Sequence, residues 1–145
     1  MMSDALTPQP TTPATPAGAA TPTAPAPDGA RIIAVTSGKG GVGKTFVSAN
    51  LAAALTRRGQ RVLVLDADLG LDNLDVVLNL HPKITLHDVF TGKAALDDAV
   101  IAAPGGFDVL LAGSGMVEYS RLTPEVRNQF LSVIQALTPR YDVVL

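Results

Sequence analysis

A glycine-rich segment between two secondary-structure signals constrains this chain more than any other feature of its sequence. Residues 38–45 read GKGGVGKT and follow residues 31–35, an apolar, β-branched run typical of a buried parallel strand. The segment leads into residues 44–58, whose apolar spacing predicts a helix, and a second apolar run at 61–65 predicts another buried strand. Strand, loop, helix and strand over so short a stretch form a βαβ unit, which is right-handed by strong precedent.

The predicted helix at 44–58 has apolar residues at a spacing of four. Val47, Leu51 and Leu55 lie on one face, with Phe46 and Ala54 alongside. Gly59 follows as a suitable C-terminal cap. We therefore expect this face to pack against the sheet.

Residues 38–45 fit the pattern G-x-x-x-x-G-K-[ST] in the strand–loop–helix setting that this pattern requires. The glycines permit positive φ angles, which turn successive N–H groups inward as an anion-binding nest. A helix beginning near Gly43 adds partial positive charge, Lys44 can reach the β- and γ-phosphates, and Thr45 can bind Mg²⁺. A Gly-rich turn with two solvated lysines, or a dinucleotide fingerprint, would leave Lys44 and Thr45 without a role. We predict that ATP phosphates contact Gly38, Lys39, Gly40, Gly41, Val42, Gly43, Lys44, Thr45 and Phe46.

Two carboxylates follow the second predicted strand, at Asp66 and Asp68. Ligands of open parallel sheets bind outside the carboxyl ends of the strands, so both acids are expected on the edge that carries the glycine-rich loop. One acid can hold a Mg²⁺-bound water and the other can orient or deprotonate the attacking water. We assign Asp66 to the metal and Asp68 to the water; the alternative is a solvated turn.

The rest of the chain continues the alternation of helices and strands. Short helices are predicted at 74–80 and from Thr85 to near Gly92, the second with Asp88 completing a capping box. A third strand is predicted at 107–112 and a fourth at 141–145. Between them a helix begins at Pro124 after the cap residue Thr123, with an apolar face made of Val126, Phe130, Val133, Ile134 and Leu137. The pattern predicts an α/β fold with a doubly wound, mostly parallel sheet.

The composition separates a tail from this ordered region. Ala, Pro and Thr fill 21 of the first 30 positions, a composition that favours disorder over a packed core. Residues 31–145 have no basic excess, and the chain has no cysteine and no apolar run long enough to span a membrane. Because the chain stops within an apolar strand, we expect residues 31–145 to be the N-terminal part of a longer domain.

Several stretches carry a family resemblance. KGGVGKT at 39–45 resembles the deviant Walker A motif of the MinD/ParA-type ATPases, and DADLGLDNLD at 66–75 resembles switch I of the MinD branch. YDVVL at 141–145 resembles the strand that leads into the second Walker motif, whose aspartate would follow Leu145. Within the branch, 66–71, 81–92 and 112–115 are most similar to the MinD-like flagellar number regulators of the FlhG type. MinD division-site proteins come second and ParA partition ATPases third.

The resemblance implies a P-loop NTPase fold that forms a homodimer around two ATP molecules. In that arrangement Lys39 crosses the interface to the partner's phosphates, Lys44 and Thr45 hold phosphate and Mg²⁺, and Asp68 positions the hydrolytic water. The implied activity is a slow, Mg²⁺-dependent ATPase that regulates flagellar number or placement in a bacterial cell. It implies a cytoplasmic protein with a flagellar or division-site partner and no specific nucleic acid. Contact with the inner membrane would come only through a C-terminal segment outside this sequence.

Other functions fit the same loop. The first alternative is division-site selection or plasmid partition by the same kind of switch. The second is a scaffold that binds nucleotide without useful turnover. The third is a metabolic P-loop enzyme, either an amidotransferase-linked ligase or a metal-cluster carrier.

Overall fold

The computed structural model describes residues 29–67, 74–113 and 123–145, so the predicted disorder of the tail concerns residues almost entirely outside these ranges. In chain order the elements are β1 (Arg31–Ile32), α1 (Lys44–Arg57), β2 (Val62–Leu65), α2 (Leu74–Leu78), α3 (Leu86–Phe90), α4 (Leu96–Ala99), β3 (Val100–Ala102), β4 (Asp108–Leu110), α5 (Pro124–Leu137), the 3₁₀ helix η2 (Thr138–Arg140) and β5 (Val143–Val144). Within the described ranges, no helix is both long and apolar enough to cross a membrane.

The strands form one sheet in the order β1-β5-β2-β4-β3. The pairs β1–β5, β5–β2 and β2–β4 are parallel, and only β3–β4 is antiparallel. This confirms the predicted mostly parallel α/β sheet. Helix α4 and the edge strand β3, which follows α4 without a loop, were not predicted from the sequence.

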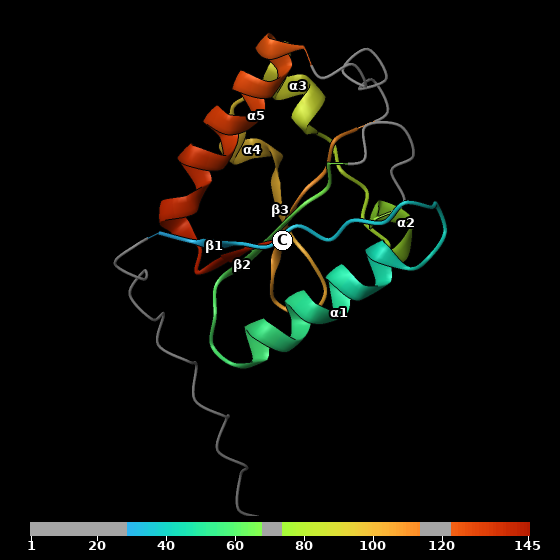
Figure 1. The fold of residues 1–145 in the computed structure, drawn as a ribbon. Coiled ribbons are helices and arrows are strands. Elements are labelled where there is room, and N and C mark those ends of the chain that lie inside the picture. Colours follow the sequence, from blue (N-terminus) through green and yellow to red (C-terminus); the bar gives the residue numbers. More distant parts are fainter. Residues whose placement is uncertain (1–28, 68–73, 114–122) are drawn as a thin grey trace, which may run out of the picture.

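Alternate residues of the central strands face two separate layers of helices. Val62, Val64 and Val109 belong to one buried cluster, which includes residues of α1 and α2. Leu63 and Leu110 belong to the other, which includes residues of α3, α4 and α5. Figure 1 shows α1 and α2 on one side of the strands and α3, α4 and α5 on the opposite side. Burial on both faces explains the continuous apolar runs at residues 62–65 and 109–112.

Helix α1 turns only part of its predicted face to the sheet, where Leu55 packs against the buried core. Ala49 and Ala52 are buried, whereas Phe46 is 66% exposed and Val47 is 52% exposed. Apolar residues surround most of this helix, so their spacing alone did not select a face. Small side chains at the contact let a helix approach closely, and the alanines therefore form the buried face.

The other predicted helices begin where their caps indicate. At α3 the Thr85 backbone N–H donates to Asp88 Oδ2 at 3.0 Å, which completes the predicted capping box and lowers the pKa of Asp88. At α5 the Val126 N–H donates to Thr123 Oγ1 at 3.4 Å. Val126, Val133 and Leu137 are buried, which confirms the inner face predicted for that helix.

The start of α3 lies against the end of β4. The backbone N–H groups of Leu86 and His87 donate to the carbonyls of Leu111 and Ala112 at 2.8 and 3.1 Å. Gly113 comes next, with φ of 90°, and a Cβ placed on it would lie 2.7 Å from Thr85 Cβ. Glycine therefore satisfies both the backbone angle and the close approach at this position.

An ion pair joins the amino ends of β2 and β5. The Arg61 Nη2 donates to Asp142 Oδ1 at 2.8 Å, and the Arg61 backbone N–H donates to Asp142 Oδ2 at 2.8 Å. The hydrogen bond to Asp142 raises the pKa of Arg61 above its ordinary value. A second pair, Arg140 with Asp97, lies on the surface.

We expect Asp142→Asn to lower the free energy of unfolding by about 2 kcal/mol, because the change removes a charged acceptor that is mostly shielded from water. Asp97→Asn is the matched control and should leave stability unchanged, since exposed pairs contribute little. Urea denaturation of both variants measures the difference. Equal effects would contradict a special role for the Arg61–Asp142 pair.

We expect Gly113→Ala to lower the free energy of unfolding by about 2–4 kcal/mol, through backbone strain and the clash with Thr85. Gly59→Ala is the control, because Gly59 also has a positive φ but faces open space, and strain alone costs about 1 kcal/mol. The two urea midpoints separate strain from contact. Equal losses of unfolding free energy in the two variants would show that the contact between residue 113 and Thr85 adds nothing to the backbone strain.

Candidate phosphate-binding site

The parallel strands bring the predicted site residues to one edge of the sheet. The glycine-rich loop follows β1 and Asp66 follows β2, so both lie at carboxyl ends of parallel strands. The Asp66 N–H donates to the Leu110 carbonyl at 3.0 Å, which extends the β2–β4 ladder to this edge. Because β5 lies between β1 and β2, the backbone of Asp66 is about 10 Å from the strand that carries the loop.

The loop has the backbone shape that an anion requires. Gly41 and Gly43 have φ of 72° and 98°, in the region that glycine favours. Gly43 is the N-cap of α1 and supplies no side-chain cap, so the first N–H groups of the helix are open to a ligand. A Cβ built on Gly38, Gly40, Gly41 or Gly43 would meet no atom within 4 Å. An open backbone with two positive φ angles beside a helix N-terminus is compatible with a bound phosphate chain.

The two lysines of the loop are placed differently. Lys44, the first residue of α1, is partly buried, and its Nζ donates to Ser37 Oγ at 3.2 Å. Ser37 Oγ in turn donates to the Lys39 carbonyl at 2.7 Å. Lys39 itself is exposed. The Lys44 ammonium is therefore held at the loop, whereas Lys39 lies on the surface.

The other predicted contacts lie on the same loop or edge. Thr45 is half-buried in the first turn of α1, while Val42 and Phe46 are exposed. Asp66 is half-buried. Asp68, assigned to the hydrolytic water, lies outside the described residues. Ser37 was not among the predicted site residues, because the motif begins at Gly38. The Ser37 hydroxyl becomes relevant only in the folded loop, where the Lys44 side chain reaches it.

The donors at this edge suit Mg²⁺ only together with a phosphate ligand. In the part of the chain that the structure describes, no three His, Cys, Asp or Glu residues gather as a metal site. Thr45 and Asp66 each offer one oxygen-bearing side chain at the edge. Mg²⁺ is commonly held by one or two protein oxygens together with substrate phosphates and water.

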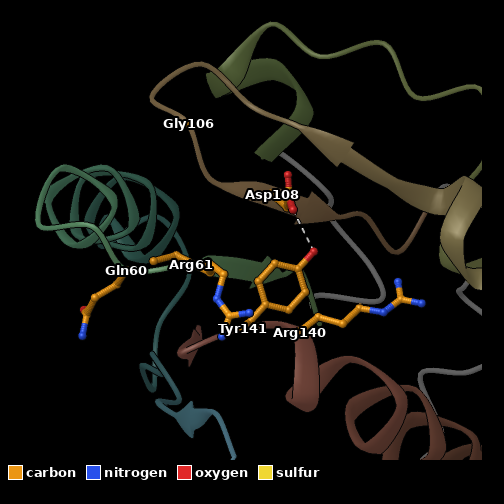
Figure 2. A pocket seen from close by; sticks show the side chains of 7 residues that line it. Gln60, Arg61, Gly106, Asp108, Arg140 and Tyr141 are labelled. Carbon is orange, nitrogen blue, oxygen red and sulfur yellow. Dashed lines mark hydrogen bonds between the residues drawn. The ribbon is translucent and has the colours of Figure 1, made fainter. Parts of the chain in front are cut away.

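A pocket of about 290 Å³ lies at the opposite edge of the sheet (Figure 2). It is lined by Gln60, Arg61, Val62, Gly106, Asp108, Arg140 and Tyr141. The Tyr141 hydroxyl donates to Asp108 Oδ2 at 2.8 Å, and both arginines are in the ion pairs described above. Burial and this hydrogen bond raise the pKa of Tyr141 above its ordinary value. Each charged group that lines the pocket already has a partner, Arg61 in Asp142, Arg140 in Asp97 and Asp108 in Tyr141, which favours a structural role.

Known proteins match this chain over most of its length. It is 46% identical to the antiactivator FleN of Pseudomonas aeruginosa over 79% of the chain and 41% of that protein. The septum site-determining protein MinD of Pyrococcus horikoshii, solved with Mg-ADP, superposes with a TM-score of 0.65 at 37% identity, over 80% of this chain and 47% of that one. Cobyrinic acid a,c-diamide synthase of Mycobacterium smegmatis, solved with an ATP analogue and magnesium, gives a TM-score of 0.69 at 28% identity, over 79% and 49%.

The chain thus spans about two fifths of the length of the relative FleN. Residues 33–142 match the family described as the CobQ/CobB/MinD/ParA nucleotide binding domain. This match covers the glycine-rich loop, the strands β2, β3 and β4 and the helices on both sides of the sheet, in the P-loop NTPase fold that the MinD structure shares. The chain belongs to the CobQ/CobB/MinD/ParA nucleotide binding domain family.

Proposed function

We propose that this chain binds ATP with Mg²⁺ at residues 38–46 and acts as a slowly hydrolysing dimerisation switch. The observation that carries the proposal is the loop itself. An open glycine-rich backbone leads into a start of α1 that has no side-chain cap, and the Lys44 ammonium is held at this loop by Ser37. Two solved relatives carry Mg-ADP or an ATP analogue with magnesium, which supports the same ligand class here.

Each residue has a distinct part in the proposed site. Lys44 neutralises charge on the β- and γ-phosphates, and the backbone N–H groups around Gly43 hold phosphate oxygens. Thr45 and Asp66 supply the protein oxygens for the ion, Asp66 through a bound water because its strand lies two positions from the loop. The ion, when bound, neutralises charge that develops on the phosphates.

Lys39 supplies the link between nucleotide and dimer. Its exposure suits a residue that reaches out of its own loop toward the phosphates of a second copy. A dimer bridged in this way depends on the γ-phosphate, because the bridging charge has less to bind once that phosphate leaves. The two states of the switch then differ in a specific contact, as a real switch requires.

Asp68 completes the proposed chemistry. It comes two residues after Asp66, on the segment that leaves the carboxyl end of β2. From this edge a carboxylate can orient a water for attack on the γ-phosphate. P-loop switches that lack a completing group from a partner hydrolyse slowly, and we propose the same of this protein.

We propose flagellar number or placement as the process that this switch regulates. The stretches at 66–71, 81–92 and 112–115 resemble the MinD-like flagellar regulators, and FleN, an antiactivator, is 46% identical to this chain. Division-site selection is the alternative within the family, supported by the similarity to septum site-determining MinD. We further propose a cytoplasmic protein whose partner belongs to the flagellar or division apparatus.

A ligase of the cobyrinic acid a,c-diamide synthase kind is a second candidate. That enzyme has the higher TM-score, 0.69, although its identity to this chain is only 28%. The two functions differ in what ATP does: a switch pairs two copies, whereas a ligase activates a carboxylate. ATP-dependent dimerisation without a carboxylate substrate therefore favours the switch.

We expect Lys44→Ala in the full-length protein to weaken MgATP binding by about 100-fold or more, because two charge-assisted hydrogen bonds to phosphate are lost. Lys93→Ala, at an exposed lysine outside the loop, is the control and should bind normally. Equilibrium titration with a fluorescent ATP analogue measures both. Unchanged affinity in Lys44→Ala would overturn the assignment of the phosphate site.

We expect Lys39→Ala to bind MgATP within about 2-fold of the wild type and to form no ATP-dependent dimer, because its charge is needed across the interface and not within its own loop. Sedimentation velocity with ATP and with ADP measures the dimer, with Lys93→Ala again as control. A Lys39→Ala dimer as stable as that of the wild type would show Lys39 to be an ordinary solvated residue.

A further inference from the structure

We propose that Ser37, the residue before the glycine-rich loop, is a positioning residue that aims Lys44 at the phosphates. The inference rests on the proposed ATP site and adds a residue to it. Two hydrogen bonds carry it: Lys44 Nζ to Ser37 Oγ at 3.2 Å, and Ser37 Oγ to the Lys39 carbonyl at 2.7 Å. Ser37 is half-buried, whereas residues 38–42, which follow it in the loop, are exposed.

The chemistry of the groups fixes the direction of both bonds. An ammonium has three donors and no acceptor, so Ser37 must accept from Lys44. The single hydroxyl proton of Ser37 is then directed to the Lys39 carbonyl, which only accepts. The ammonium, the hydroxyl and the carbonyl thus form two linked hydrogen bonds, and each bond strengthens the other by polarising the shared hydroxyl.

These two hydrogen bonds join the two ends of the loop. The bond from Ser37 to Lys39 closes a small ring around Gly38, and the bond from Lys44 returns from the first turn of α1. Ser37 itself follows β1, whose ladder continues through the Ile33 N–H to the Val144 carbonyl at 2.8 Å. The ammonium is therefore held relative to the sheet as well as to the helix that carries it.

The arrangement leaves Lys44 ready for a ligand. With one N–H on Ser37, two N–H groups remain for oxygens of the β- and γ-phosphates. A long, flexible side chain that is already aimed loses less freedom when the phosphate binds. The same hydroxyl fixes the carbonyl of Lys39, so it also sets the backbone from which that residue extends.

The test compares Ser37→Ala with Ser37→Thr and Ser132→Ala in the full-length protein. Ser132 on α5 is the matched control, since its hydroxyl likewise donates to a backbone carbonyl, that of Asn128, at 2.9 Å. The probes are MgATP and inorganic tripolyphosphate, which has no base or sugar and so reports the phosphate loop alone. The affinity of each probe is measured by competition against a fluorescent ATP analogue, alongside the urea midpoint of each variant.

We expect Ser37→Ala to weaken MgATP and tripolyphosphate by the same factor, about 3- to 10-fold, which is the value of one net hydrogen bond. Ser37→Thr keeps the hydroxyl and should restore binding, and Ser132→Ala should bind as the wild type does. Unchanged affinity in Ser37→Ala, or an equal loss in Ser37→Thr, would overturn the inference and leave the proposed ATP site standing. A wild type that binds neither probe would overturn both.

Discussion

The hydrogen bonds that β5 makes on both of its sides hold the candidate site together. On one side the Ile33 N–H donates to the Val144 carbonyl, and on the other the Leu65 N–H donates to the Leu145 carbonyl, both at 2.8 Å. The loop after β1 and the acid after β2 have no direct strand contact, since β5 separates them. Their relative position is therefore set by a strand of two residues, Val143 and Val144, which is buried on both faces of the sheet.

The elements that position the site could be predicted because each has a strong local signal. Buried parallel strands are continuously apolar, as residues 62–65 are, and the motif at 38–45 requires a strand before it and a helix after it. Thr85 with Asp88 and Thr123 with Pro124 marked two helix starts to the residue. Strand β3 was not predicted because it has only three residues, one of them alanine, and follows α4 directly. So short a stretch shows no alternation that would distinguish a strand from the end of the helix.

Side-chain placement was harder to predict than backbone. The inner face of α1 was predicted only in part: Leu55 packs against the core as expected, but Phe46 and Val47 are exposed, and Ala49 and Ala52 are the buried residues. The role of Ser37 also depends on tertiary geometry, because a hydroxyl seven residues before Lys44 becomes its partner only when the loop is folded. The role of Asp68 stays a prediction from the sequence, because that residue lies outside the described part of the chain.

The place of β5 in the sheet has a consequence for how the protein is made. A ribosome releases β1, the loop and α1 early, but the strand that fits between β1 and β2 is the last of the described elements to appear. Until residues 143–144 have emerged, β1 has no described strand to pair with, and α1 has only part of its sheet surface. The glycine-rich loop is thus synthesised before the strand that fixes its position, so it takes its place at the sheet edge only once β5 has paired with β1 and β2.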